Sequence, residues 1–334
     1  MNRVVYVTVF AIFIFIACNT EESITINNTI PVVKQTSSYT VLVDENIVFA
    51  KGLSHDGISP STQEMPILLD VYHPNNNSTN RPVFMFIHGG GFQGGTKTKP
   101  EIIAMGNYFA SRGWVFVSID YRTVEDLGTI FTGIAPQKWI DITLQNSSSP
   151  GDTKTSIAMY AAQRDAKAAL RWIIANANTY NINSDYITVG GASAGAITAI
   201  ALGISNQEDF RDEIPLYEDP TLSTTNLSET FVVKSIIDYW GSNVKLDVFN
   251  LVYGTERYDS NDPELFIAHG TLDPTVLYSE ATELNNIYNT LDIYSELVPL
   301  VDKGHGPWSA TVNGKSLFEM SFDFLVERQN LNIQ

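Results

Sequence analysis

The stretch Gly191-Ala192-Ser193-Ala194-Gly195 fits the pattern G-x-S-x-G and joins two segments of different character. The preceding segment, Tyr186 to Val189, has the β-branched composition of a short strand, and Gly195 to Gly203 has the composition of a helix. Small residues two positions before and after the serine allow the sharp strand-to-helix turn that exposes a nucleophilic hydroxyl group. An ordinary turn of small residues has the same letters, but this placement favours Ser193 as a nucleophile.

Segments typical of strands and helices alternate on both sides of this turn, without a break in composition, from about Tyr39 to Arg328. The run Val83 to Ile87 is continuously apolar, which is typical of a central strand buried on both faces. The other predicted strands are 39–49, 66–72, 114–119, 232–239, 265–268 and 294–300, and the other predicted helices are 101–111, 157–177, 275–291 and 315–327. The sequence therefore predicts one α/β domain, residues 39–334, with a doubly wound, mostly parallel sheet and helices on both faces.

A glycine-rich loop, His88-Gly89-Gly90-Gly91-Phe92, follows the predicted central strand. Glycines permit positive φ and bring backbone N–H groups within about 3 Å of an oxygen that becomes negatively charged during a reaction. We predict that Gly90 and Gly91 supply such groups. The N–H of Ala194, at the start of the helix after Ser193, is predicted to supply another.

Two further residues stand in loops after predicted strands. Asp273 lies in His269-Gly270-Thr271-Leu272-Asp273-Pro274, and His305 lies between glycines in Lys303-Gly304-His305-Gly306-Pro307. Such loops meet at the carboxyl edge of a parallel sheet, so we expect His305 to act as general base for Ser193 and Asp273 to orient the imidazole. Capping of the predicted helix 275–291 is the alternative role for Asp273.

Together these motifs resemble the bacterial α/β-hydrolase esterases, which include carboxylesterases, hormone-sensitive-lipase-like esterases and acetyl and feruloyl esterases acting on plant polysaccharides. The chain order Ser193, Asp273, His305 is the order of that fold. The further segments that carry the resemblance are 69–74, 120–122, 165–172 and 266–276. The resemblance implies the α/β-hydrolase fold, hydrolysis of carboxylic esters through an acyl-enzyme intermediate, water as acyl acceptor and no cofactor; no metal site is expected.

One segment departs from the pattern. Residues 123–156 are longer than a usual strand-to-helix connection and carry Phe131, Pro136 and Trp139. We expect this insertion to lie over the site, as a lid or as one wall of the acyl pocket. A disordered surface insertion is the alternative.

The beginning of the chain has the pattern of an export signal. Arg3 precedes an apolar run, Val4 to Ala17, that is short for a membrane span, so residues 1–17 are predicted to be a signal peptide. Phe15-Ile16-Ala17-Cys18 resembles the lipobox of bacterial lipoproteins, and Cys18 is the single cysteine of the chain. We therefore expect lipidation at Cys18, a linker over 18–38, and a periplasmic or cell-surface protein that meets the membrane only through its anchor.

The net charge of −17 argues against nucleic acid as a partner. We expect the substrate to be a small or polysaccharide-linked ester, with acetyl and feruloyl groups favoured. Three aromatic residues, Phe92, Trp139 and Trp308, are candidates for stacking on its rings, and packing is their alternative role. The oligomeric state is left open by the sequence.

Two other classes of function are also open. Gly89, Gly91 and Gly94 fit G-x-G-x-x-G, and Asp120 ends the next predicted strand, as in a nicotinamide-dependent oxidoreductase. A hydrolase-like surface binding protein without catalytic activity would retain the fold and the anchor. Covalent labelling of Ser193 distinguishes an esterase from both.

Overall fold

The computed structural model describes residues 29–56, 59, 61–254 and 257–334. Its centre is an eight-stranded sheet. In order across the sheet, the strands are β2 (Val41–Ser54), β3 (Gln63–Pro74), β5 (Val115–Ile119), β4 (Arg81–Ile87), β6 (Ile182–Ala192), β7 (Val233–Tyr239), β8 (Glu264–Gly270) and β9 (Ser295–Leu300). The pairs β2–β3 and β3–β5 are antiparallel, and the strands from β5 to β9 are parallel to one another. The predicted doubly wound, mostly parallel sheet is confirmed.

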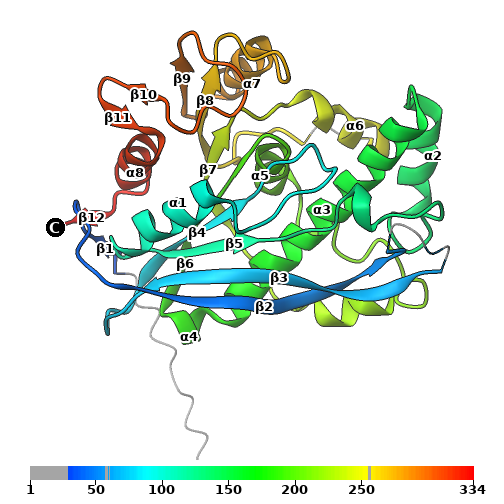
Figure 1. Ribbon diagram of the computed structural model, residues 1–334, viewed down its shortest axis with the longest axis horizontal. Helices are drawn as coiled ribbons and strands as arrows, with labels where there is room; N and C mark the ends of the chain where they lie inside the picture. Colours follow the sequence, from blue (N-terminus) through cyan, green and yellow to red (C-terminus); the bar gives the residue numbers. More distant parts are fainter. Residues whose placement is uncertain (1–28, 57–58, 60, 255–256) are drawn as a thin grey trace, which may run out of the picture.

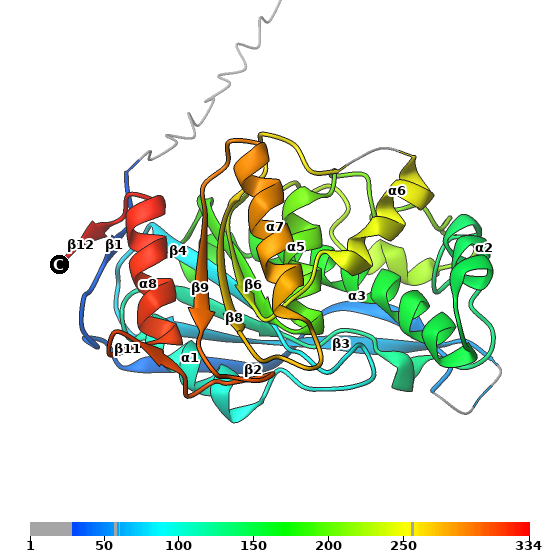
Figure 2. The same cartoon turned by 90° about the horizontal axis from the view of Figure 1, so that it is seen from above.

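Helices cover both faces of this sheet (Figures 1 and 2). One face is covered by α1 (Pro100–Ala110) and α8 (Leu317–Arg328), and the other by α3 (Pro150–Ala175), α5 (Ala194–Ile204) and α7 (Tyr278–Thr290). The shorter elements are β1 (Val32–Val33), η1 (Val124–Asp126), α2 (Gln137–Asn146), α4 (Ala177–Tyr180), η2 (Pro220–Thr224), η3 (Val244–Asp247), α6 (Val248–Tyr253), β10 (Thr311–Val312), β11 (Lys315–Ser316) and β12 (Asn332–Ile333). None of the helices in the described part of the chain is both long and apolar enough to cross a bilayer.

Strand β4 shows how the sheet separates two apolar cores. All seven of its residues are buried. Because successive side chains of a strand point to opposite faces, Val83, Met85 and Ile87 pack with α3 and α5, whereas Phe84 and Phe86 pack with α1 and α8. A strand buried on both faces must be continuously apolar, which is why this run was recognisable in the sequence.

The predicted linker over 18–38 is wrong for its described part. Val32 and Val33 form β1, which pairs in parallel with β12 at the end of the chain, and Val33 is fully buried. The Gln334 N–H donates to Val33 O at 2.9 Å. A polar linker composition therefore conceals a short strand that buries one apolar side chain against the C-terminus. The predicted signal peptide and Cys18 lie outside the described residues.

The segment 123–156 has a defined fold. Trp139 of α2 is buried between the rings of Tyr160 and Phe210, at centroid distances of 5.3 and 5.7 Å. The next helix, α3, begins at Pro150 and not at the predicted residue 157, because the Ser149 side chain caps it by accepting from Asp152 N. The alternative of a disordered insertion is therefore wrong, and the lid remains a hypothesis.

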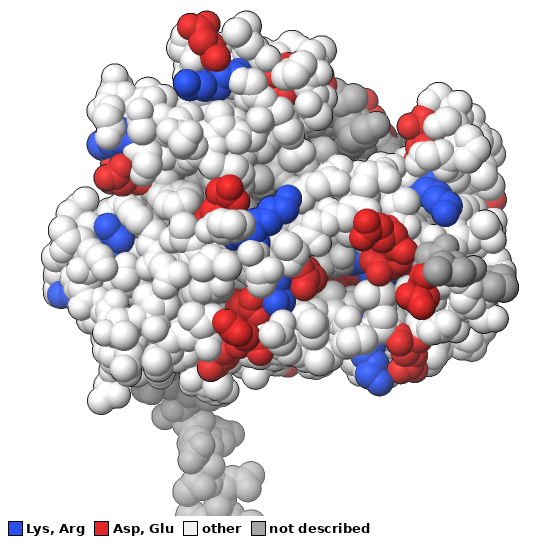
Figure 3. All heavy atoms as spheres, in the orientation of Figure 1, with Lys and Arg blue, Asp and Glu red and all other residues white. Residues whose placement is uncertain are grey.

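Charged side chains on the surface are dispersed. On the face shown in Figure 3, acidic groups form several separate clusters, many of them beside a Lys or Arg. Pairs such as Lys51–Glu64, at 3.0 Å, are half-exposed, so each contributes no more than about 1 kcal/mol to stability.

Candidate active site

Ser193 lies at the turn between β6 and α5 with a φ of +55°. Left-handed backbone is strained for a non-glycine residue, and here close packing around the turn maintains it. A Cβ on Gly191 would lie 2.2 Å from the Gly195 carbonyl group, and a Cβ on Gly195 would lie 2.1 Å from Ile87 O. The glycines on either side of the serine are therefore required by the approach of α5 to β4 and β6.

The structure brings Ser193, His305 and Asp273 together. His305 Nε2 lies 3.0 Å from Ser193 Oγ, and His305 Nδ1 lies 2.7 Å from Asp273 Oδ2. Asp273 follows β8 and His305 follows β9, so adjacent parallel strands deliver both residues to the edge of the sheet where Ser193 projects. The Asp273 side chain is buried, whereas that of His305 is 24% exposed, which leaves Ser193 and one edge of the imidazole accessible.

The two oxygens of the Asp273 carboxylate have separate partners. Oδ1 accepts from the backbone N–H groups of Thr275 and Val276 at 2.8 and 3.0 Å, which leaves Oδ2 to accept from His305. Burial alone would raise the pKa of Asp273, but the hydrogen bonds from His305, Thr275 and Val276 outweigh it and lower the pKa. The carboxylate is thus ionised and held in one rotamer. The capping alternative is incorrect in detail, because the N-cap of α7 is Leu277.

The predicted oxyanion loop lies directly against Ser193, the predicted nucleophile. A Cβ on Gly89 would lie 2.5 Å from Ala192 O and 3.2 Å from Ser193 Cβ. Gly90 and Gly91 have φ values of +151° and +62°, and a Cβ on Gly90 would lie 1.9 Å from Gly94 O. Only glycine fits this turn.

The three backbone N–H groups predicted to hold an oxyanion, those of Gly90, Gly91 and Ala194, donate to no acceptor among the described residues. Ala194 is the first residue of α5, where the N–H groups have no partner within the helix. Free N–H groups beside a nucleophile are the chemical requirement for stabilising a tetrahedral oxyanion.

Side chains that the sequence analysis did not single out support this loop. Tyr121 Oη donates to His88 O at 2.9 Å, and its ring stacks on the His88 ring at 4.3 Å. Gln93 Nε2 donates to Thr155 Oγ1 at 2.6 Å, which joins the loop to the first turns of α3. Burial lowers the pKa of His88 to about 4, so this imidazole is neutral and its role here is packing. Tyr121 belongs to the segment 120–122, and the family resemblance of that segment was the feature of the sequence that could have identified it.

Two of the three aromatic residues predicted to stack on substrate are buried. Phe92 is 3% exposed and Trp139 is fully buried in the core described above, so the stacking prediction is wrong for both residues and their alternative role, packing, is the one observed. Trp308 is partly exposed, and its ring lies 5.1 Å from that of Trp240, which in turn contacts His305 edge-on at 6.4 Å. Trp240 and Trp308 therefore support the His305 loop, and only Trp308 retains an accessible face.

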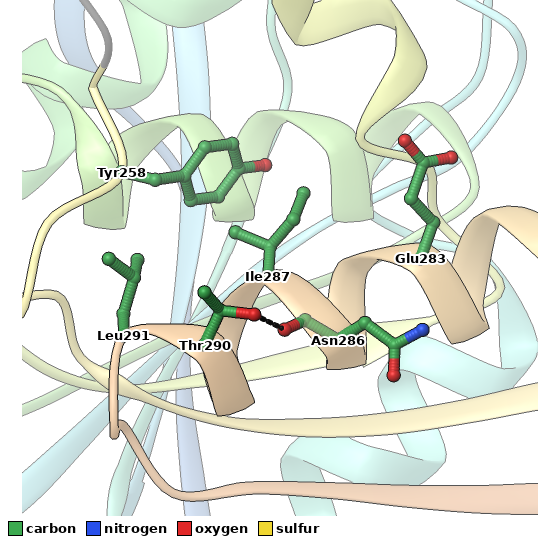
Figure 4. A pocket seen from close by; sticks show the side chains of 6 residues that line it. All are labelled: Tyr258, Glu283, Asn286, Ile287, Thr290 and Leu291. Carbon is green, nitrogen blue, oxygen red and sulfur yellow. Dashed lines mark hydrogen bonds between the residues drawn. The ribbon is translucent and has the colours of Figure 1, made fainter.

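A hollow of about 370 Å³ lies elsewhere, on the outer side of α7 (Figure 4). Tyr258, from the segment after α6, faces Ile287 across it. Its lining residues are Tyr258, Glu283, Asn286, Ile287, Thr290 and Leu291. None of the candidate catalytic residues contributes to it, so this hollow is distinct from the site around Ser193.

A buried carboxyl group lies beside the turn that carries Ser193. Asp238 of β7 stands beside Gly191 of β6 in the sheet, and its Oδ1 accepts from Gly241 N at 2.7 Å. Its Oδ2 is buried without a hydrogen-bond partner in the described part of the chain. Burial raises the pKa of Asp238 to about 7.

This raised pKa predicts how Asp238→Asn changes stability with pH. The unfolded chain releases the proton near the ordinary value of 3.8, whereas the folded protein keeps it up to about 7, so the wild type loses stability as pH rises through this window. The variant lacks this loss. From pH 4 to pH 8, the free energy of unfolding of the variant should therefore increase by up to about 4 kcal/mol relative to that of the wild type. Urea titrations across this range measure the difference, and parallel curves would contradict it.

The sheet order, the crossovers and a serine turn facing a His–Asp pair define an α/β-hydrolase fold. The chain belongs to the BD-FAE family, whose model matches residues 69–136 and 153–255, just over half of the chain. Ser193 lies within the matched residues, whereas Asp273 and His305 lie beyond them.

Curated relatives and solved structures agree with this assignment. The chain is 28% identical over 206 residues to carboxylesterase 1C of Rattus norvegicus, covering 59% of this chain and 33% of that protein. It is 24% identical over 238 residues to esterase LipC of Mycobacterium tuberculosis, covering 64% and 50%. The chain thus spans a third to a half of the length of these two relatives.

Two solved structures share the fold. One is a truncated form of a carbohydrate esterase from gut microbiota, with a TM-score of 0.56 and 17% identity, covering 89% of this chain and 99% of that chain. The other is esterase 2 of Thermogutta terrifontis, with a TM-score of 0.56 and 20% identity, covering 83% and 92%. At these identities the likeness shows the fold alone.

Proposed function

We propose that the protein is a serine carboxylic ester hydrolase. The observation that carries the proposal is the continuous chain of hydrogen bonds from Ser193 Oγ through His305 to Asp273, beside three backbone N–H groups without partners among the described residues. A serine hydroxyl group becomes a competent nucleophile when a neighbouring imidazole accepts its proton. The esterases among the relatives, one of them a carboxylesterase, support the same chemistry.

The proposed reaction has two steps. Ser193 Oγ attacks the ester carbonyl carbon while His305 Nε2 takes the hydroxyl proton, and the N–H groups of Gly90, Gly91 and Ala194 hold the oxyanion. Collapse of the tetrahedral intermediate breaks the ester C–O bond, and His305 donates the proton to the leaving alcohol. Water then attacks the acyl-enzyme with His305 again as base, which releases the acid and restores Ser193. Asp273 stabilises the imidazolium in both steps.

The finer proposal concerns substrate and location. We propose acetyl or feruloyl esters of extracellular polysaccharides, supported by the carbohydrate esterase among the structural neighbours and by the partly exposed Trp308 beside the His305 loop. The accompanying location, a lipoprotein anchored at Cys18, is proposed from the sequence pattern at residues 15–18. Separating membrane and soluble fractions of cells that express the full chain tests the location, because an unprocessed soluble protein would contradict it.

Labelling and a substrate panel test the function. A fluorophosphonate should modify one serine per chain, identified as Ser193 by peptide mass spectrometry. The value of kcat/KM for methyl ferulate or acetylated xylan should exceed that for a long-chain triglyceride by at least about tenfold, a margin of about 1.4 kcal/mol in transition-state stabilisation.

The other outcomes discriminate among the remaining functions. Preference for the triglyceride would refute the substrate class and leave the esterase. Stabilisation by NAD without labelling would support an oxidoreductase using the 89–94 loop. Binding of the polysaccharide with neither labelling nor turnover would support a non-catalytic binding protein.

A further inference from the structure

A second imidazole, that of His269, lies against the carboxylate of Asp273. His269 is in β8, and its side chain is fully buried. Its Nε2 lies 2.9 Å from Val276 O and 3.4 Å from Asp273 Oδ2, the same oxygen that accepts from His305. Its Nδ1 is buried and has no hydrogen-bond partner within the described residues.

These contacts determine the tautomer of His269. A carbonyl oxygen can only accept, so the proton must be on Nε2, where it donates to Val276 O; Asp273 Oδ2 lies 3.4 Å from the same nitrogen. A second proton on Nδ1 would be buried without an acceptor, which costs free energy. Burial accordingly lowers the pKa of His269. The ring is therefore neutral, with its single N–H aimed into the turn that carries Asp273.

The titratable groups around this ring are few. Asp273 belongs to the same loop, His305 comes from the loop after β9, and Glu280 comes from the first turn of α7. The ring of Tyr278 contacts His269 edge-on at 6.0 Å. The charge nearest to the His269 N–H is thus the carboxylate that the proposed reaction uses.

We infer that His269 is a positioning residue, whose neutral N–H holds Asp273 Oδ2 in place for His305 and moderates the negative charge that this oxygen offers to the imidazolium. Oδ1 is already held by two backbone N–H groups, so the side-chain groups next to Oδ2 are His305 Nδ1 at 2.7 Å and His269 Nε2 at 3.4 Å. This inference rests on the proposed esterase function.

Removing this N–H has a defined expected effect. Without it, Asp273 Oδ2 carries more charge toward His305, which stabilises the imidazolium and raises the pKa seen in the acid limb of kcat/KM. The carboxylate is also less firmly oriented, so kcat should fall by about 10- to 100-fold, whereas KM, which reflects contacts with the substrate, should change little.

The experiment compares His269→Leu, which is similar in size but lacks a donor, with His269→Gln, whose amide nitrogen can reach the position of Nε2. The matched control is His73→Leu, since His73 is also a histidine of a sheet strand but, unlike His269, is partly exposed and contacts Asp44 and Tyr180. Active sites are counted with a fluorophosphonate, so that rates refer to folded enzyme. We expect the Leu variant to have a lower kcat and a higher pKa for the acid limb of kcat/KM. The Gln variant should return most of the way to the wild-type values of both quantities, and the control should match the wild type.

Two results would overturn the inference. One is a Leu variant with wild-type kcat and pH profile per titrated site, even if its melting temperature falls, because His269 would then be only a packing residue. The other is measured on the wild-type protein alone, so the inference can still be tested if the Leu variant does not fold. Nitrogen NMR of the imidazoles should show His269 neutral and protonated on Nε2 at pH 7, and an Nδ1–H tautomer or a charged ring at that pH refutes the contact. Failure of the proposed function is distinct, since the wild type would then neither hydrolyse esters nor react with the label.

Discussion

Ser193→Ala is expected to lower kcat/KM for a p-nitrophenyl acyl ester by about 10⁴- to 10⁶-fold, a range typical for loss of a triad serine. The hydroxyl oxygen is the atom that forms the acyl bond in the proposed reaction, and no other hydroxyl group of the described residues bonds to His305 Nε2. The residual rate would reflect the oxyanion donors and substrate binding, which the substitution leaves in place.

Stability should change little in this variant, because the Ser193 side chain makes only the hydrogen bond to His305 among the described contacts. Ser205→Ala is the matched control, since Ser205 ends the same helix α5 and its hydroxyl group is buried without a partner in the described chain. This control should retain wild-type turnover. A Ser193→Ala enzyme with a rate within about tenfold of wild type would refute Ser193 as nucleophile.

Asp273→Asn is expected to lower kcat by about 10³- to 10⁴-fold, and the local hydrogen bonds explain why. The two N–H groups of Thr275 and Val276 require an acceptor at the Oδ1 position, so the amide oxygen of the variant must stay there. The amide NH₂ group then replaces Oδ2 and faces His305 Nδ1. Because both would be donors, His305 must move its proton to Nε2, where it can no longer accept the proton of Ser193.

Asp302→Asn is the matched control for this substitution. Asp302 is exposed, precedes His305 by three residues and adopts the positive φ that asparagine tolerates, so the same loss of charge occurs near the same loop. Steady-state kinetics of both variants, at equal active-site concentration, measure the difference. If both variants lose activity to the same extent, net charge near the loop is responsible and the tautomer argument fails.

Local patterns were sufficient for several parts of this protein. The turn at Ser193 was predictable because its pattern is local, with glycine at 191 and 195 between a strand and a helix. The packing reason for Gly195 is a tertiary contact, since a Cβ there would lie 2.1 Å from Ile87 O of β4. The run Val83 to Ile87 was predictable because a strand buried on both faces must be continuously apolar. The order Ser193, Asp273, His305, each in a loop after a strand, then favoured one fold and one candidate set of residues.

Contacts between distant segments were not encoded in any local pattern. Pairing of β1 with β12 joins opposite ends of the chain, and the composition of residues 29–38 is that of a linker. Trp139 is core and not a surface for sugars because residues of α3 and of the segment after α5 surround it. Which oxygen of Asp273 meets His305, and that His269 faces the same oxygen, depends on how β8, β9 and α7 pack together. Residue type and spacing therefore determined the turns and the candidate chemistry, whereas burial, tautomers and hydrogen-bond partners were decided by packing in three dimensions.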